Sequence, residues 1–166
     1  MNFRHLYFFL ALFLLNTTLL NAQNYKGAIG LRLGYPVSVS GKLFIGETTA
    51  LEAFVGTRGY TYFRWVNAGL AYQKYQLLEI EDLEGLSWYY GAGLNAYFWT
   101  YEDLFVGDES SLSFGVSGYI GLDYAFEDLP LNLTIDWVPT FFINSYLGGF
   151  GGRYGSLGIR YIFSRE

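Results

Sequence analysis

The stretch from Ser113 to Pro139, SFGVSGYIGLDYAFEDLPLNLTIDWVP, holds two segments of alternating apolar and polar residues that a short turn separates. Because successive side chains of a β-strand point to opposite faces, this alternation predicts a hairpin. With residues 127–130 as the turn, the apolar residues of both strands fall on one face. The predicted cross-strand pairs are Phe126 with Leu131, Tyr124 with Leu133, Leu122 with Ile135 and Ile120 with Trp137.

The opposite face of this hairpin carries Asp123, Asn132, Thr134 and Asp136, interleaved with glycines. Such a face is too polar for a dry core and has too little bulk for an ordinary protein surface. The combination is typical of a membrane barrel with lipid outside and a polar interior.

The N-terminal segment predicts export. Arg4 supplies a positive charge, residues 6–15 form an unbroken apolar run, and Ala22 offers a small residue at a cleavage point. The run is shorter than the roughly 20 apolar residues that span a bilayer. We therefore expect a cleavable signal peptide at residues 1–22 and a single domain over residues 23–166.

The composition narrows the classes of protein. Without Arg4, the 144 residues that follow the leader carry 9 Lys plus Arg against 15 Asp plus Glu, a net charge of −6 that argues against nucleic-acid binding. The absence of Cys excludes a disulfide scaffold and a lipoprotein anchor. Charged residues make up 15% of the chain, against about 25% in soluble domains. Beyond the leader no apolar stretch is long enough for a spanning helix, so alternating strands must carry the membrane signal.

The same alternation continues along the chain and predicts eight strands. They lie at 27–35, 38–45, 50–58, 63–77, 86–99, 113–126, 131–137 and 154–163. Short turns are expected at 46–49, 79–85 and 127–130, and loops on the other side at 36–37, 59–62, 100–111 and 141–153. An even number of strands returns both termini to one side, as bacterial single-chain barrels require. We predict an all-β fold, an eight-stranded antiparallel up-and-down transmembrane β-barrel.

The predicted inward face carries three positive and three negative side chains. They are Arg32, Lys42, Arg160, Glu52, Asp123 and Asp136. An eight-stranded barrel has little space beyond its own side chains, and buried charges are tolerated when they are paired. We expect a filled, neutral interior; the alternative is a path for ions or protons. The glycine opposite Asp136, Gly121, leaves room for a guanidinium to bind that carboxylate with two nitrogens. The other inward glycines could ease curvature or leave a void.

Enzymatic activity is not expected. The only histidine, His5, lies in the leader, so the rest of the chain has neither His nor Cys for a His-based triad or a typical zinc site. Residues 91–96 spell GxGxxA, but no βαβ unit surrounds them. We predict no catalytic residues, no metal and no cofactor.

A soluble, exported, lipocalin-like barrel is the rival fold, with its apolar face turned inward around a ligand. Its outer face would then hold about eight glycines and few charges. The aromatics also cluster near strand ends, as expected for girdles at two membrane interfaces. These clusters are Tyr60, Tyr62, Phe63 and Trp65; Trp88, Tyr89 and Tyr90; Phe98, Trp99 and Tyr101; and Phe141 and Phe142.

The leader, the eight alternating strands, the charged interior and the closing residues Tyr161-Ile162-Phe163 resemble the small outer-membrane β-barrels of the OmpA membrane-domain, OmpX and OmpW type. The resemblance covers residues 27–163. It implies a bacterial outer-membrane location, contact with outer-membrane lipid and lipopolysaccharide, and a monomer. It also implies that Tyr161 and Phe163 form the signal that the barrel-assembly machinery recognises, although three residues follow Phe163 here.

This resemblance implies roles that range from structure and adhesion to passage of small apolar molecules. We expect a structural or surface-interaction role, with an OmpW-like channel for small apolar molecules as the alternative. Loops on a rigid scaffold usually carry binding, and the aromatic residues of the last loop are candidate contacts or, equally, interfacial anchors. These candidates are Phe141, Phe142, Tyr146 and Phe150.

Overall fold

The structure is a computed structural model that describes residues 25–34, 36–59, 63–80, 83–101, 109–143, 149–151 and 155–165. The strands are β1 Gly27–Gly34, β2 Val37–Gly46, β3 Thr49–Gly59, β4 Phe63–Leu77, β5 Leu86–Tyr101, β6 Glu109–Ala125, β7 Leu131–Trp137, β8 Thr140–Phe142, β9 Gly149–Gly151 and β10 Gly155–Ser164. In the described part of the chain, no helix is long and apolar enough to cross a membrane. The predicted signal peptide, residues 1–22, lies outside the described residues.

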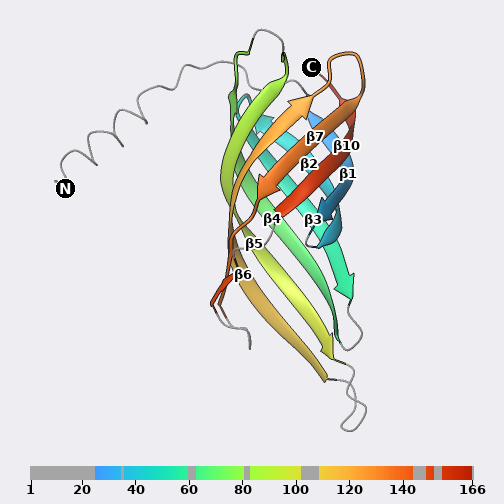
Figure 1. Cartoon of the computed structure of the whole chain (residues 1–166), viewed down its shortest axis with the longest axis vertical. Helices are drawn as coiled ribbons and strands as arrows, with labels where there is room; N and C mark the ends of the chain where they lie inside the picture. The colour runs from blue at the N-terminus through green and yellow to red at the C-terminus, as the bar shows by residue number, and fades with distance from the viewer. Residues whose placement is uncertain are drawn as a thin grey trace, which may run out of the picture.

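The strands close into a barrel (Figure 1). Each strand from β1 to β6 pairs with its neighbours in the chain, and β7 and β10 complete the circle between β6 and β1. β6 pairs with β7 and β8 in one continuous register, and the backbone N of Gly118 donates to the carbonyl of Pro139 between them (2.9 Å). Pro139 interrupts the strand because proline has no N–H to donate. Eight strands, β1 to β7 and β10, form the closed barrel, as predicted; β8 continues β7 beyond Pro139 and pairs with β9.

The hairpin that the sequence predicted is confirmed in its register. Ile120 pairs with Trp137, Leu122 with Ile135 and Tyr124 with Leu133, and the backbone N of Phe126 donates to the carbonyl of Leu131. A slip of one residue would turn every apolar side chain to the opposite face. The alternating pattern therefore fixes both the pairing and the direction in which each side chain points.

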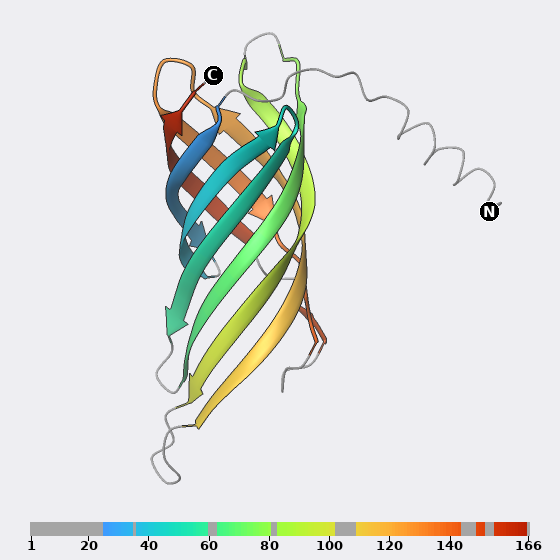
Figure 2. The ribbon, with the colours of Figure 1, turned by 180° about the vertical axis from the view of Figure 1, so that it is seen from behind.

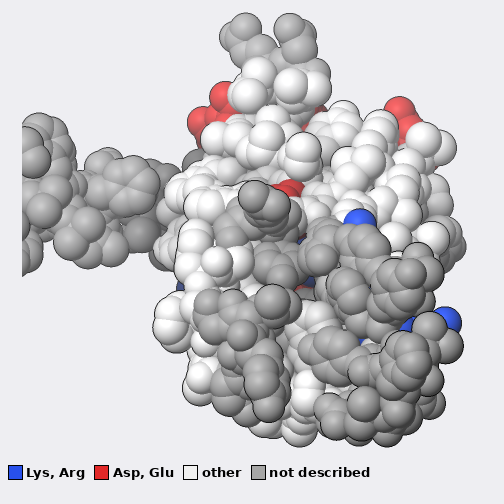
Figure 3. All heavy atoms as spheres, turned by 60° about the horizontal axis from the view of Figure 1, so that its bottom comes forward, with Lys and Arg blue, Asp and Glu red and all other residues white. Residues whose placement is uncertain are grey.

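The apolar faces of all strands point outward. Large apolar side chains that would be buried in a soluble protein are half exposed here, for example Leu94 at 68% and Ile135 at 59%. Figure 3 shows the wall on the visible side as almost free of charged residues. The soluble alternative required the opposite arrangement, so it is wrong for this chain.

Two loop predictions are also wrong. β5 and β6 continue into the predicted loop at 100–111, where Thr100 pairs with Ser110 and Tyr101 with Glu109. β9 and the last two residues of β8 lie within the predicted loop at 141–153. The strands were predicted to end where polar and glycine residues begin. Backbone pairing does not require apolar side chains, so the strands continue beyond the apolar part of the wall.

The barrel wall has unequal height. β4, β5 and β6 contain 15, 16 and 17 residues, whereas β1, β2 and β10 contain 8, 10 and 10. Figure 2 shows the long strands extending past the others at the end opposite the C-terminal end of β10. We name this end the loop end, and the end with the turns at 47–48, 78–85 and 126–130 the turn end.

Candidate functional site

The interior of the barrel is the candidate site, and its turn-end half contains a charged layer. The six charged residues predicted to point inward all lie there, each at most 7% exposed. They come from six different strands, so the layer links opposite sides of the barrel. The residues are Arg32 on β1, Lys42 on β2, Glu52 on β3, Asp123 on β6, Asp136 on β7 and Arg160 on β10.

Glu52 is the central acceptor of the charged layer. Its carboxylate accepts a hydrogen bond from Nη2 of Arg160 and lies 3.6 Å from Nη1 of Arg32. Nε2 of Gln73 donates to its other oxygen at 2.9 Å. One carboxylate therefore lies between two guanidinium groups from neighbouring strands.

Asp136 is the second acceptor of Arg32. Nη2 of Arg32 donates to Oδ2 of Asp136 at 2.8 Å, and the Tyr89 hydroxyl donates to the same oxygen at 2.7 Å. The prediction that a guanidinium would bind Asp136 with two nitrogens is wrong, since Nε of Arg32 donates to Ser156 instead. The space above Gly121 is taken by Tyr89, whose Cζ would lie 2.8 Å from a Cβ at that position.

Lys42 and Asp123 form the third part of the layer. Nζ of Lys42 donates to Oδ2 of Asp123 at 3.0 Å and lies 5.0 Å from the centroid of the Tyr89 ring. The hydroxyl of Tyr25, which precedes β1, donates to the same carboxylate at 3.1 Å. Burial raises the pKa of the Tyr25 phenol well above its ordinary value, and the charge of Asp123 adds to this rise. Tyr25 therefore stays protonated and remains a donor.

Arg160 connects the charged layer to β2 and β7. Its Nε donates to Ser40 at 2.9 Å and its Nη1 donates to Thr134 at 2.8 Å. A Cβ at Gly158 would lie 2.6 Å from Nη1 of Arg160, so this glycine makes room for the guanidinium. At Gly121 and Gly158 the space inside the barrel is filled by a neighbouring side chain and is not a void.

Three cations and three anions balance in the charged layer. Each has an opposite charge within 3.6 Å, so the Coulomb attraction offsets the cost of removing these groups from water. Chemically, the arrangement can tie β1, β2, β3, β6, β7 and β10 together. None of the six is an unpaired charge that would attract a passing ion.

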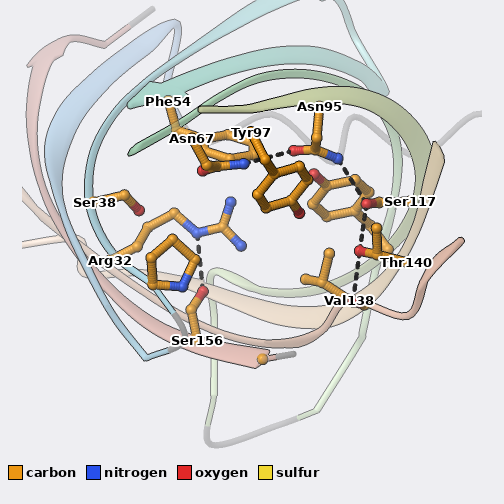
Figure 4. Close-up of a pocket in the computed structure, with 13 residues that line it drawn as sticks. Arg32, Ser38, Phe54, Asn67, Asn95, Tyr97, Ser117, Val138, Thr140 and Ser156 are labelled. Carbon is orange, nitrogen blue, oxygen red and sulfur yellow. Dashed lines mark hydrogen bonds between the residues drawn. The ribbon is translucent and has the colours of Figure 1, made fainter. Parts of the chain in front are cut away.

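Towards the loop end, a neutral layer follows the charged one. Asn67 donates to Asn95 (3.3 Å), Asn95 donates to Ser117 (2.7 Å), and Ser117 and Thr140 share a hydrogen bond of 2.6 Å (Figure 4). These four residues were not singled out from the sequence, because small neutral polar residues also occur on ordinary surfaces. The sequence feature that indicates their inward position is that they alternate with apolar residues along their strands.

A small cavity of about 30 Å³ lies between Arg32 and this chain of hydrogen bonds. Figure 4 shows the Arg32 guanidinium on one side of it and Asn95 and Ser117 on the other. Such a volume holds one or two water molecules. Oδ1 of Asn67, which lines the cavity, is buried without a protein partner in the described part of the chain, so a water molecule is its natural partner.

Aromatic side chains complete the neutral layer. Trp65, Tyr97, Trp99 and Phe142 form one buried cluster, with ring centroids 5.1 Å apart for Tyr97 and Phe142. The prediction that Trp65, Trp99 and Phe142 belong to membrane girdles is therefore wrong, and Tyr89 is buried in the same way. Strand alternation explains this, since Trp65 shares the inward face of Asn67.

The candidate loop contacts lie in different environments. Phe141 and Phe150 face one another across β8 and β9 and are 57% and 70% exposed. Phe142 is 8% exposed and packs inside the barrel, so it is not available for contacts at the surface. Tyr146 lies outside the described residues.

The C-terminal aromatics lie on the outward face of β10, with Tyr161 58% and Phe163 55% exposed. The Phe163 ring lies over Gly27 of β1, where a Cβ would come within 2.5 Å of its Cζ. Beyond Phe163, the Arg165 guanidinium donates to the carbonyls of residues 126, 127 and 129. The end of β10 is thus attached to the turn between β6 and β7.

Metal binding has no candidate in the part of the chain that the structure describes. No group of three or more His, Cys, Asp or Glu side chains there is arranged to hold a metal ion. The acidic groups of the charged layer already have cationic partners.

Comparison with known proteins supports the fold. No protein-family model matches the sequence, and no curated protein matches it. Among solved structures, the N-terminal β-barrel domain of Pseudomonas aeruginosa OprF is similar with a TM-score of 0.63 and 15% identity, covering 84% of this chain and 97% of that domain. Neisserial surface protein A is similar with a TM-score of 0.59 and 15% identity, covering 82% and 93%. The chain thus has the fold of the small, OmpA-type, eight-stranded outer-membrane barrels.

Proposed function

We propose that this chain is an integral protein of the bacterial outer membrane whose barrel interior is closed by paired charges, and that its role is structural or concerns contacts at the cell surface. The observation that carries this proposal is the inverted distribution of side chains. Apolar residues cover the outside of every long strand, while the six charged residues of the charged layer are paired inside. Burying such charges and exposing such a wall is favourable only where the solvent outside is lipid.

The turn end would face the periplasm and the loop end the exterior. Both ends of the described chain lie at the turn end, and the extended strands β4, β5 and β6 project at the opposite end, where bacterial barrels carry their longer outer segments. On this orientation, the exposed pair Phe141 and Phe150 lies at the outer surface or its interface. It can contact lipopolysaccharide or another surface partner. Tyr161 and Phe163 are exposed on β10, where the assembly machinery could read them before the barrel closes.

A channel for small apolar molecules has less support. The cavity in the neutral layer, about 30 Å³, is far smaller than the roughly 300 Å³ or more of a typical small-molecule pocket. The charged layer below it offers no apolar surface. We assign no enzymatic activity to the chain.

The proposal is tested by refolding the purified chain without its leader in the presence and absence of detergent or lipid vesicles. We expect β-structure, a compact species that shifts on heating in gel electrophoresis, and protease protection only when an apolar phase is present. Cell fractionation should place the protein with the outer membrane. A monomer that is folded in plain buffer would contradict the proposal.

A further inference from the structure

Lys74 is unusual because it stands on the outward, apolar face of β4. In the described strands, the charged residues on this face are Lys74 and Arg64, and Arg64 lies at the loop end, one residue after β4 begins. Lys74 lies three residues from the other end of β4, with exposed Tyr72 beside it on the same face. A lysine at this place needs an anionic or aqueous partner for its ammonium group.

Cross-strand pairing connects Lys74 to the middle of the wall. Lys74 is opposite Tyr90, Tyr90 is opposite Ile120, and Ile120 is opposite Trp137. Counted from the strand ends at the turn end, these residues lie 3 (77 − 74), 4 (90 − 86), 5 (125 − 120) and 6 (137 − 131) positions inward. This row of four residues, from Lys74 to Trp137, therefore leads from the rim of the barrel towards its middle.

The row runs into an apolar depression of about 440 Å³ on the outer face of the wall. It is lined by two tryptophans and three aliphatic residues, together with Gly121 and with Asp136, whose carboxylate binds Arg32 inside the barrel. The apolar residues are Trp88, Ile120, Leu122, Ile135 and Trp137. Trp88 connects Lys74 to the depression, since it lines the depression and is the diagonal neighbour of Lys74 across β4 and β5. Its ring is 5.5 Å from that of Tyr90.

We propose that Lys74 and this depression bind one anionic phospholipid of the leaflet at the turn end. The phosphate contacts the Lys74 ammonium, the rings of Trp88 and Tyr90 lie at the level between headgroup and chain, and an acyl chain occupies the depression. The positive charge of Lys74 favours an anionic headgroup. The row leads from the rim towards the middle of the wall, which is the direction in which an acyl chain extends from its headgroup into the bilayer. This site rests on the proposed function, because an acyl chain reaches the depression only if the wall faces a bilayer.

The test is native mass spectrometry of the folded, detergent-solubilised protein titrated with phosphatidylglycerol. We expect one lipid to remain bound to the wild type at low lipid concentration. Lys74→Gln should weaken this binding about fivefold, the equivalent of about 1 kcal/mol for one basic residue near a lipid surface. Lys26→Gln is the matched control, since Lys26 is an exposed lysine at the same end but lies outside the row; it should leave binding unchanged.

A second pair of variants tests the depression. Leu122→Trp fills it without changing any charge and should also release the lipid, whereas Ile159→Trp, on the wall of β10, should not. Equal affinity of Lys74→Gln and wild type, or equal loss in Lys74→Gln and Lys26→Gln, would overturn the lipid site. Insertion into vesicles is measured for every variant. A chain that inserts but shows no Lys74 dependence refutes only this site, whereas a chain that never inserts refutes the proposed function.

Discussion

The two halves of the barrel interior are built on different principles. In the charged layer, the six ionised side chains are paired and their oxygens and nitrogens also bind Tyr25, Gln73, Tyr89 and Asn132. In the neutral layer, single hydrogen bonds connect amides and hydroxyls, a small cavity remains, and buried atoms such as Oδ1 of Asn67 and Nε1 of Trp99 lack a protein partner in the described chain. The charged layer at the turn end should therefore contribute more to the free energy of unfolding than the neutral layer. The side chains of the neutral layer, towards the loop end, should rearrange more easily.

The largest effect is expected at the centre of the charged layer. Glu52→Gln keeps the shape of the side chain but leaves Arg32 and Arg160 without their shared carboxylate. Removing one partner of a buried ion pair costs about 3 to 5 kcal/mol. Urea unfolding of the protein in lipid vesicles measures this cost. Glu84→Gln, the same change at an exposed turn residue, is the control, and equal effects of the two substitutions would refute a stabilising role of the charged layer.

The second largest effect on the free energy of unfolding is expected on the outward face of the wall, where the cost of a charge depends on its position along the strand. Leu70→Arg places a charge halfway along β4, where we expect a cost of about 2 to 4 kcal/mol. Leu112→Arg places it near the loop end of β6, where about 0 to 1 kcal/mol is expected. The same vesicle titrations compare them. A higher cost at Leu112 would show that the membrane surrounds the loop-end extension and not the middle of the wall.

A smaller loss is expected within the neutral layer. Asn95→Ala removes the hydrogen bonds to Asn67 and Ser117. Because the adjacent cavity can admit water to these groups, we expect a loss of only about 1 kcal/mol. A loss as large as that of Glu52→Gln would mean that both layers stabilise the barrel equally.

The smallest effect is expected at the tip of the loop end. Phe150 is 70% exposed, so Phe150→Ser should change the free energy of unfolding by no more than about 0.5 kcal/mol. If the exposed pair serves surface contacts, the same variant should weaken cell-surface binding while the barrel still assembles. Unchanged binding would leave Phe150 as an interfacial anchor.

The sequence predicted the strands, the register of the hairpin and the inward charges because alternation with period two determines all three. The partners of these charges could not be predicted in the same way. The contact between Glu52 and Arg160 depends on barrel closure, which brings strands from both ends of the chain together. The space above Gly121 went to Tyr89 because a phenol on the neighbouring strand reaches it.

The inward aromatics show a second limit. Clustering near strand ends predicted girdles, but Trp65 and Trp99 follow the parity of their strands and point inward. Face assignment by alternation was the better guide than proximity to a strand end. The extension of β5 and β6 past the apolar wall had no apolar signal, since residues such as Ser110 and Ser111 are compatible with a loop.

We propose that the charged layer closes the barrel to ions. Single-channel recording of the purified, folded protein in planar lipid bilayers tests it most directly. We predict no steady conductance above the background of the bilayer, because three buried cations and three buried anions neutralise one another across the interior. A large, steady, ohmic conductance from the wild-type protein would contradict this account.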